Sequence, residues 1–184
     1  MMRKLNAFLR DNQGIAAIEM AFILPLLLFL YFGLVDVTAA ISLNRKITYS
    51  ASVVADLVTQ KQTTIASTEM DDYFNAAALV LKPTPVSGVR VEIYQYRKVA
   101  NVITNQWSKK SSNGTACSAP STTGFNNLMT DGNDLIVAVV CTTYKPYMAS
   151  FLGNYILGSA TFNMSEQIAL RPRSSTTLDC TGCS

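Results

Sequence analysis

GIAAIEMAFILPLLLFLYFGLVD, residues 14–36, sets the architecture of this 184-residue chain. Its apolar part runs from Ile15 to Val35 and contains one charged residue, Glu19. At about 1.5 Å of rise per residue, that part is roughly 31 Å long as a helix, close to the ~30 Å hydrocarbon thickness of a bilayer. The sequence therefore predicts a transmembrane helix over residues 15–36.

The position of the Glu19 carboxylate within an apolar run requires a physical explanation. A charged side chain costs on the order of 2.5–3.5 kcal/mol at the centre of a bilayer. Glu19 lies in the first turns of the expected helix, where the helix dipole favours an anion and the interface is near enough for partial hydration. In one interpretation Glu19 only snorkels to the membrane edge. In the other it has a charged partner, and that interpretation depends on Gly14.

The order of residues around Gly14 resembles a type IV prepilin processing site: basic residues, a glycine, and an apolar helix whose fifth residue is glutamate. Within that class, residues 14–36 resemble the N-terminus of the TadE-like pseudopilins of the Tad (Flp) pilus systems. The basic residues are Arg3, Lys4 and Arg10, and the family's recurring positions are matched by Gly14, Ala17, Glu19, Ala21, Pro25 and Asp36.

The resemblance implies that a prepilin peptidase cuts after Gly14 and makes Ile15 the mature N-terminus. The new α-ammonium would lie at low dielectric and need a counter-ion, which Glu19 of a neighbouring subunit can supply. The resemblance also implies storage in the membrane, followed by assembly into a pilus or priming of one. The implied partners are major and minor pilin subunits and an inner-membrane assembly platform with its cytoplasmic ATPase.

Charges on either side of the span favour a cytoplasmic N-terminus, because Arg3, Lys4 and Arg10 precede it and only Arg45 and Lys46 follow it closely. The rest of the chain would then be periplasmic, anchored by a single pass in a bacterial inner membrane, or carried into an extracellular pilus. All four cysteines would lie on that exported side, where disulfides form and persist.

A cleavable signal peptide is the main alternative for the N-terminus, since Thr38-Ala39-Ala40 offers small residues at a possible cleavage site. The apolar part of such a peptide has about 7 to 15 residues, however, and the run here is longer. A glutamate five residues after a glycine is also not part of that pattern.

The apolar spacing continues beyond the span as one face of a helix. The positions are Leu43, Ile47, Ala51, Val54 and Val58. We expect one helix from about Ile15 to Gln60, kinked at Pro25, whose exported half is a stalk packed on the head. A separate amphipathic helix after the span is the alternative.

The predicted organisation is a basic leader (1–14), a transmembrane helix (15–36), a stalk helix (37–61), a periplasmic α+β head (62–172) and a flexible C-terminal tail (173–184). The head is expected to be pilin-like, with a small antiparallel sheet. Its expected elements are a helix from Thr68 to Leu81, strands at Val89–Val99, Val102–Lys109, Leu135–Tyr144 and Ser159–Leu170, an exposed loop at Ser108–Asn127, and a short helix or packed loop at Pro146–Leu157. The last of these is interpreted as core, with an exposed subunit contact as the alternative.

Composition argues against several classes of function. The net charge is only +3, without a basic stripe, so nucleic acid is not expected as a partner. The chain has no histidine, which removes the usual nucleophile systems and most catalytic zinc sites. We expect no catalytic residue, no metal site and no cofactor.

Four cysteines allow three pairings, and we predict Cys117 with Cys141 and Cys180 with Cys183, on the ground that the closely spaced pair joins locally. The sequence thus favours a pilin-like subunit of a Tad pilus. Two alternatives are an unprocessed membrane-tethered binding domain and, less favoured, a secreted thiol-disulfide protein that uses the Cys180-x-x-Cys183 spacing.

Overall fold

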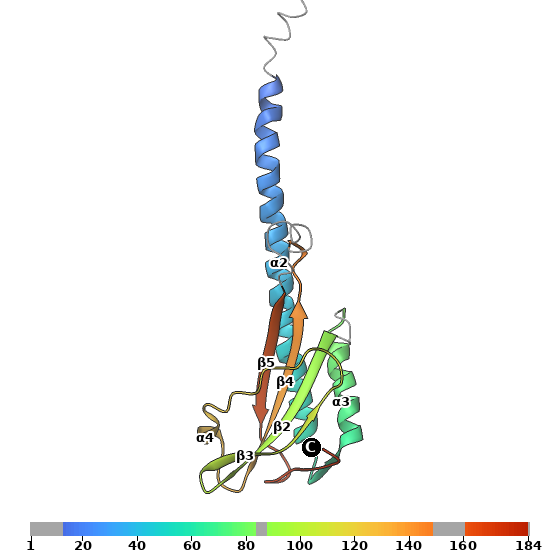
Figure 1. Cartoon of the computed structure of the whole chain (residues 1–184), viewed down its shortest axis with the longest axis vertical. Coiled ribbons are helices and arrows are strands. Elements are labelled where there is room, and N and C mark those ends of the chain that lie inside the picture. The colour runs from blue at the N-terminus through green and yellow to red at the C-terminus, as the bar shows by residue number, and fades with distance from the viewer. Residues whose placement is uncertain (1–12, 84–87, 149–160, 184) are drawn as a thin grey trace, which may run out of the picture.

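The structure is a computed structural model and describes residues 13–83, 88–148 and 161–183. It shows one long helix, α2 (Gln13–Thr59), whose first half projects beyond an α+β head (Figure 1). The expected fold class and the continuous helix are both confirmed, and α2 is unbroken at Pro25. The kink at Pro25 stays a prediction.

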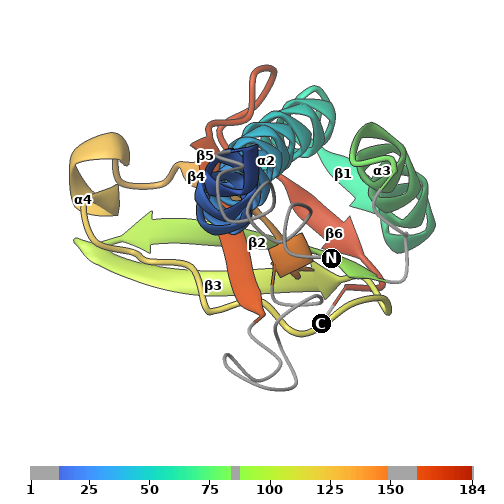
Figure 2. The same cartoon turned by 90° about the horizontal axis from the view of Figure 1, so that it is seen from above.

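The second half of α2 packs on the head through the face that its apolar spacing predicts. Four of the expected core positions on this face, Ile47, Ala51, Val54 and Val58, are fully buried. Helix α3 (Ser67–Val80) lies beside α2, and the two helices cover the same side of the sheet (Figure 2). The carboxylate of Glu69 accepts a hydrogen bond from the backbone N–H of Ala66, which satisfies a donor at the start of α3.

The sheet is antiparallel throughout, in the order β3-β2-β4-β5. Its strands are β2 (Val89–Val99), β3 (Val102–Lys110), β4 (Asp134–Tyr144) and β5 (Phe162–Leu170). β2 and β4 are the central strands. For β4, the apolar character of residues 135–144 predicts this position.

The chain's own polar loop covers the central part of the second face of the sheet. The loop between β3 and β4 carries the short helix α4 (Phe125–Leu128), and Phe125 and Met129 are buried against Tyr94, Tyr96 and the outer side of β4. The alternation of residues 89–99 predicts a half-buried strand, and the burial of this strand on both faces contradicts that prediction. The loop expected at residues 108–127 is mostly exposed, as predicted, but it docks on the sheet through Phe125. A few buried residues are enough to dock a loop whose other residues are mostly exposed.

The C-terminal segment is also ordered, and the expectation of a flexible tail over 173–184 is contradicted for the described residues 173–183. Strand β6 (Asp179–Thr181) pairs in parallel with β1 (Thr64–Ala66), and Leu178 is fully buried. The side chain of Trp107 donates a hydrogen bond to the Leu178 carbonyl, at 3.0 Å. The Asp134 carboxylate, held by Arg97, accepts another from the Leu178 N–H, at 2.7 Å. These partners fix the segment against the sheet, and the head extends to Cys183.

Most of Pro146–Leu157, for which a short helix or packed loop is expected, lies outside the described residues. The expected start of the last strand at Ser159 does too, and β5 begins at Phe162.

Candidate functional site

The first half of α2 carries every residue that the sequence singles out for processing and assembly. Gly14, Ile15, Glu19 and Pro25 are all exposed. Among the described helices, α2 is the one long and apolar enough to cross a membrane, and no residue of its most apolar window is buried. This half of the helix is available to lipid or to other chains.

No described residue packs against Gly14. A Cβ atom at this position would meet nothing within 4 Å, and its backbone is not in the left-handed region that requires glycine. The same holds for Gly33, further along α2. Any requirement for glycine at position 14 must therefore come from something outside this fold.

The Glu19 side chain makes no hydrogen bond or ion pair with another described residue. Because it projects from the part of α2 that leaves the head, no described residue of its own chain offers it a counter-charge. The geometry leaves its carboxylate free to meet a group on another molecule.

Asp36 joins the projecting half of α2 to the head. Its Oδ1 accepts hydrogen bonds from the Tyr147 N–H at 2.7 Å and the Tyr144 hydroxyl at 3.2 Å. Its Oδ2 accepts one from the Met148 N–H at 2.8 Å. The side chain of Asp36 is consequently buried, with 8% exposed, while its neighbours Val35 and Val37 on the helix are exposed.

Burial and the same contacts raise the pKa of the Tyr144 hydroxyl. Burial is the largest cause that raises the pKa of its hydroxyl, to about 12, and the negative charge of Asp36 and its hydrogen bond add to the effect. The phenol is therefore a fixed donor to Asp36 at physiological pH. From the sequence, Asp36 is recognisable only as an acidic residue at the end of the apolar run. Its two backbone N–H donors cannot be recognised from side-chain patterns.

Two further contacts hold the stalk half of α2. The hydroxyl of Ser50 donates to the Ala77 carbonyl of α3 at 3.1 Å, and the Lys46 ammonium donates to the Lys82 carbonyl at 2.9 Å. Together with Asp36, these bonds fix the direction in which the projecting half leaves the head.

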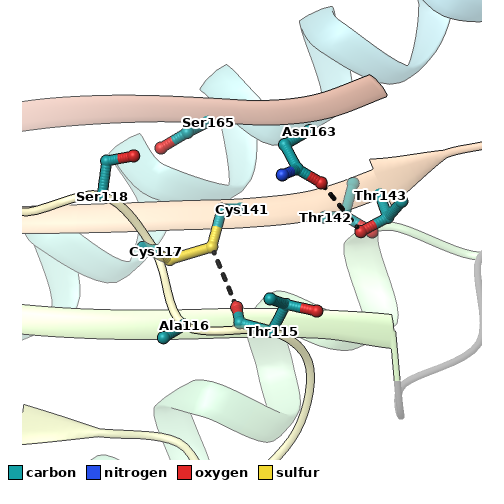
Figure 3. Close-up of a pocket in the computed structure, with 9 residues that line it drawn as sticks. All are labelled: Thr115, Ala116, Cys117, Ser118, Cys141, Thr142, Thr143, Asn163 and Ser165. Atoms are coloured by element: carbon teal, nitrogen blue, oxygen red, sulfur yellow. Dashed lines mark hydrogen bonds between the residues drawn. A yellow bond between two sulfur atoms is a disulfide. The ribbon is translucent and has the colours of Figure 1, made fainter. Parts of the chain in front are cut away.

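The four cysteines lie within disulfide distance in the predicted pairs, Cys117 with Cys141 and Cys180 with Cys183. The first pair ties the polar loop to β4, beside a shallow hollow lined by hydroxyl and amide side chains such as Thr143 and Asn163 (Figure 3). Its volume of about 50 Å³ has room for little more than one or two waters.

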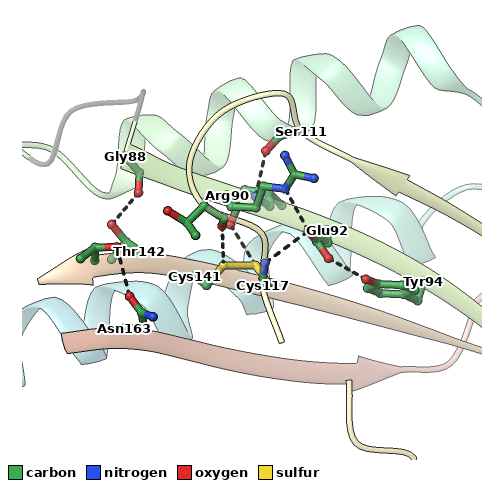
Figure 4. Close-up of a disulfide and its surroundings, with 12 residues drawn as sticks. Gly88, Arg90, Glu92, Tyr94, Ser111, Cys117, Cys141, Thr142 and Asn163 are labelled. Atoms are coloured by element: carbon green, nitrogen blue, oxygen red, sulfur yellow. Dashed lines mark hydrogen bonds and ion pairs between the residues drawn. A yellow bond between two sulfur atoms is a disulfide. The ribbon is translucent and has the colours of Figure 1, made fainter. Parts of the chain in front are cut away.

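A buried ion pair fixes the same loop (Figure 4). The Glu92 carboxylate, 2% exposed, accepts hydrogen bonds from Arg90 at 2.9 Å, the Tyr94 hydroxyl at 2.6 Å and the Cys117 N–H at 3.4 Å. Burial raises the pKa of Glu92, but these three donors outweigh it and hold the pKa below its usual value. The alternation of β2 places Glu92 on the expected solvent side, so this role escaped the sequence prediction.

The local pair Cys180–Cys183 closes the turn after β6, and the sulfur of Cys183 lies 4.0 Å from that of Met70 on α3. It therefore holds the end of the chain against the core. Among the described residues, no three side chains of the metal-binding types gather at one place.

Comparison with known proteins agrees with the resemblance of the N-terminus. Residues 14–56, less than a quarter of the chain, match the family described as TadE-like protein. The match covers most of α2 and includes Gly14, Glu19, Pro25 and Asp36. No curated protein and no solved structure matches the chain. The TadE-like segment and the apolar helix together indicate a membrane protein associated with a Tad pilus.

Proposed function

We propose that this protein is a minor pilin-like (pseudopilin) subunit of a Tad/Flp-type pilus, stored in the membrane, cleaved at its leader, and assembled into the pilus or used to prime it. The observation that carries the proposal is the exposed first half of α2, which presents Gly14 and Glu19 within a TadE-like segment. The head is braced to the same helix by Asp36, Ser50 and Lys46.

In this proposal the protein acts by assembly. A prepilin peptidase releases the leader after Gly14, and Ile15 gains an α-ammonium at the first turn of the helix. The carboxylate of Glu19 on a neighbouring subunit then pairs with that ammonium. In a dry environment an unpaired charge of either sign is costly, so the pair selects one register between adjacent helices.

The orientation follows from the charges. The basic leader stays in the cytoplasm, α2 crosses the inner membrane once, and the disulfide-bonded head lies in the periplasm. The inner-membrane platform and the major and minor pilins are the proposed partners of the helix.

The mature N-terminus tests the proposal most directly. Membrane-extracted protein is sequenced from its N-terminus by mass spectrometry. The pseudopilin proposal expects Ile15 as the first residue. Met1 would instead favour a tethered binding domain, and Ala40 or a neighbour would favour a secreted protein.

A further inference from the structure

The end of the head nearest the projecting half of α2 exposes large aromatic side chains. Tyr147, just after β4, is 65% exposed, and Phe162, at the start of β5, is 57% exposed. Phe162 is paired in register with Tyr144, whose hydroxyl reaches Asp36. Lys145 is exposed in the same place. We call Tyr147, Phe162 and Lys145 the proximal face of the head.

The depth of the proximal face relative to a membrane is fixed by the chain itself. Asp36 ends the apolar run that begins at Ile15, and that run is roughly 31 Å long as a helix, about one bilayer core. Because Asp36 binds the backbone N–H of Tyr147 directly, Tyr147 lies at the depth where the span leaves the hydrocarbon.

The junction is suited to a place with little water. Both carboxylate oxygens of Asp36 are hydrogen-bonded, by two backbone N–H groups and one phenol. A carboxylate satisfied in this way does not depend on bulk water for its solvation. The one anion at the exit of the span can therefore sit in the headgroup region.

We propose that the proximal face rests in the headgroup region of the bilayer, so that the head lies against the membrane while the subunit is stored there. Tyrosine suits that region because its ring is apolar and its hydroxyl stays wet, and Lys145 can reach anionic headgroups. Exposure alone does not identify the surface, since Val102, which pairs with Val99 at the end of the sheet opposite Tyr144, is 60% exposed. The inference rests on the span in the proposed function and is independent of pilus assembly.

The test uses the full-length chain in lipid nanodiscs containing phosphatidylcholine brominated on the acyl carbons closest to the headgroup, which quenches nearby tryptophan fluorescence. Tyr147→Trp and Phe162→Trp place probes on the proximal face, and Val102→Trp is the matched control at the far end of the head. Leu27→Trp, near the middle of the span, reports on the span and is measured in parallel nanodiscs whose lipid is brominated deep in the acyl chains. The native Trp107 is kept, and its signal is measured in the unaltered chain.

We expect the added tryptophans at positions 147 and 162 to be quenched roughly twofold and blue-shifted, and the one at 102 to behave as in water. Adding phosphatidylglycerol should strengthen quenching at 147, and Lys145→Gln should remove that increase.

If the tryptophans at positions 147 and 162 are quenched no more than the one at 102, while the one at 27 is quenched, the inference is overturned and the span stands. The tryptophan at position 147 could instead show a blue shift without bromine quenching, and that shift could disappear when each disc holds one chain. This result would overturn the inference and indicate that the face contacts a second copy of the chain. No quenching at 27 would refute the span, and with it both this inference and the proposed function.

Discussion

The Asp36 Oδ1 and the Tyr147 backbone N–H are 2.7 Å apart, although 111 positions of sequence separate them. This bond makes the head and the projecting half of α2 one unit at the point where the apolar run ends. A rotation of the head about the helix would break it together with the bonds to Met148 and Tyr144. The face that α2 offers to other chains is therefore set by the head.

Asp36→Asn should loosen this junction. The amide nitrogen of asparagine would face a backbone N–H donor, and the negative charge would be lost. Hydrogen bonds to charged groups contribute about 1.5–3 kcal/mol each, so hydrogen exchange of the Tyr147 and Met148 amides should accelerate roughly ten- to a hundredfold. Asp72→Asn, at an exposed position on α3, is the matched control and should change neither amide. Unchanged protection in Asp36→Asn would show that the junction is held by other contacts.

Gly14→Val should block removal of the leader without disturbing the fold. In the part of the chain that the structure describes, an added Cβ at position 14 meets nothing within 4 Å, so we attribute the defect to the approach of the peptidase to the backbone. Gly33→Val is a matched control, because Gly33 is equally uncrowded on the same helix. Membrane fractions analysed by mass should show full-length protein for Gly14→Val and protein beginning at Ile15 for Gly33→Val. Normal cleavage of Gly14→Val would refute the assignment of the processing site.

Glu19→Gln separates a membrane anchor from an assembly element. The amide keeps the shape and is easier to bury, so insertion and cleavage after Gly14 should survive. The α-ammonium of the neighbouring subunit would lose its counter-ion, at a cost of roughly 3–5 kcal/mol, which shifts an assembly equilibrium by more than a hundredfold. Cross-linking to pilins and piliation should therefore fail. If both persist at wild-type level, Glu19 does no more than snorkel.

Glu92 should make the head sensitive to acid. Its pKa in the folded chain is lower than the ordinary 4.5, so the stabilisation it provides is fully present above that value and is lost as the pH falls through the folded pKa. Urea unfolding of the detergent-solubilised chain at pH 7 and at about pH 3 should show a smaller acid-induced loss of stability in Glu92→Gln than in the wild type. Glu166→Gln, on edge strand β5, serves as the control. An equal loss in Glu92→Gln and the wild type would mean that other carboxylates govern the acid response.

Local sequence patterns predict the segments whose contacts are with residues close in sequence or with surroundings other than protein, such as lipid. The apolar run that ends at Val35 predicts a helix long and apolar enough to cross a membrane, and the three- and four-residue spacing from Leu43 to Val58 predicts the face that is buried. The alternating residues of Val89–Val99 predict a strand with the observed bounds. The pairing of Cys180 with Cys183 follows from their closeness.

Tertiary structure decided the rest, because it depends on groups that carry no signal in the sequence. Asp36 is bound mainly by backbone N–H groups, which every residue but proline offers, so no pattern could name Tyr147 and Met148 as its donors. The alternation of residues 89–99 places Glu92 on the face of the strand that is expected to be exposed to water. Glu92 is buried because the loop docks on that face through Phe125 and Cys117. The polar C-terminal segment becomes ordered because Asp134 and Trp107, brought together by the sheet, bind the backbone of Leu178. In each case a long-range contact overrides the local preference, since burying a satisfied polar group costs little once its partners are already in place.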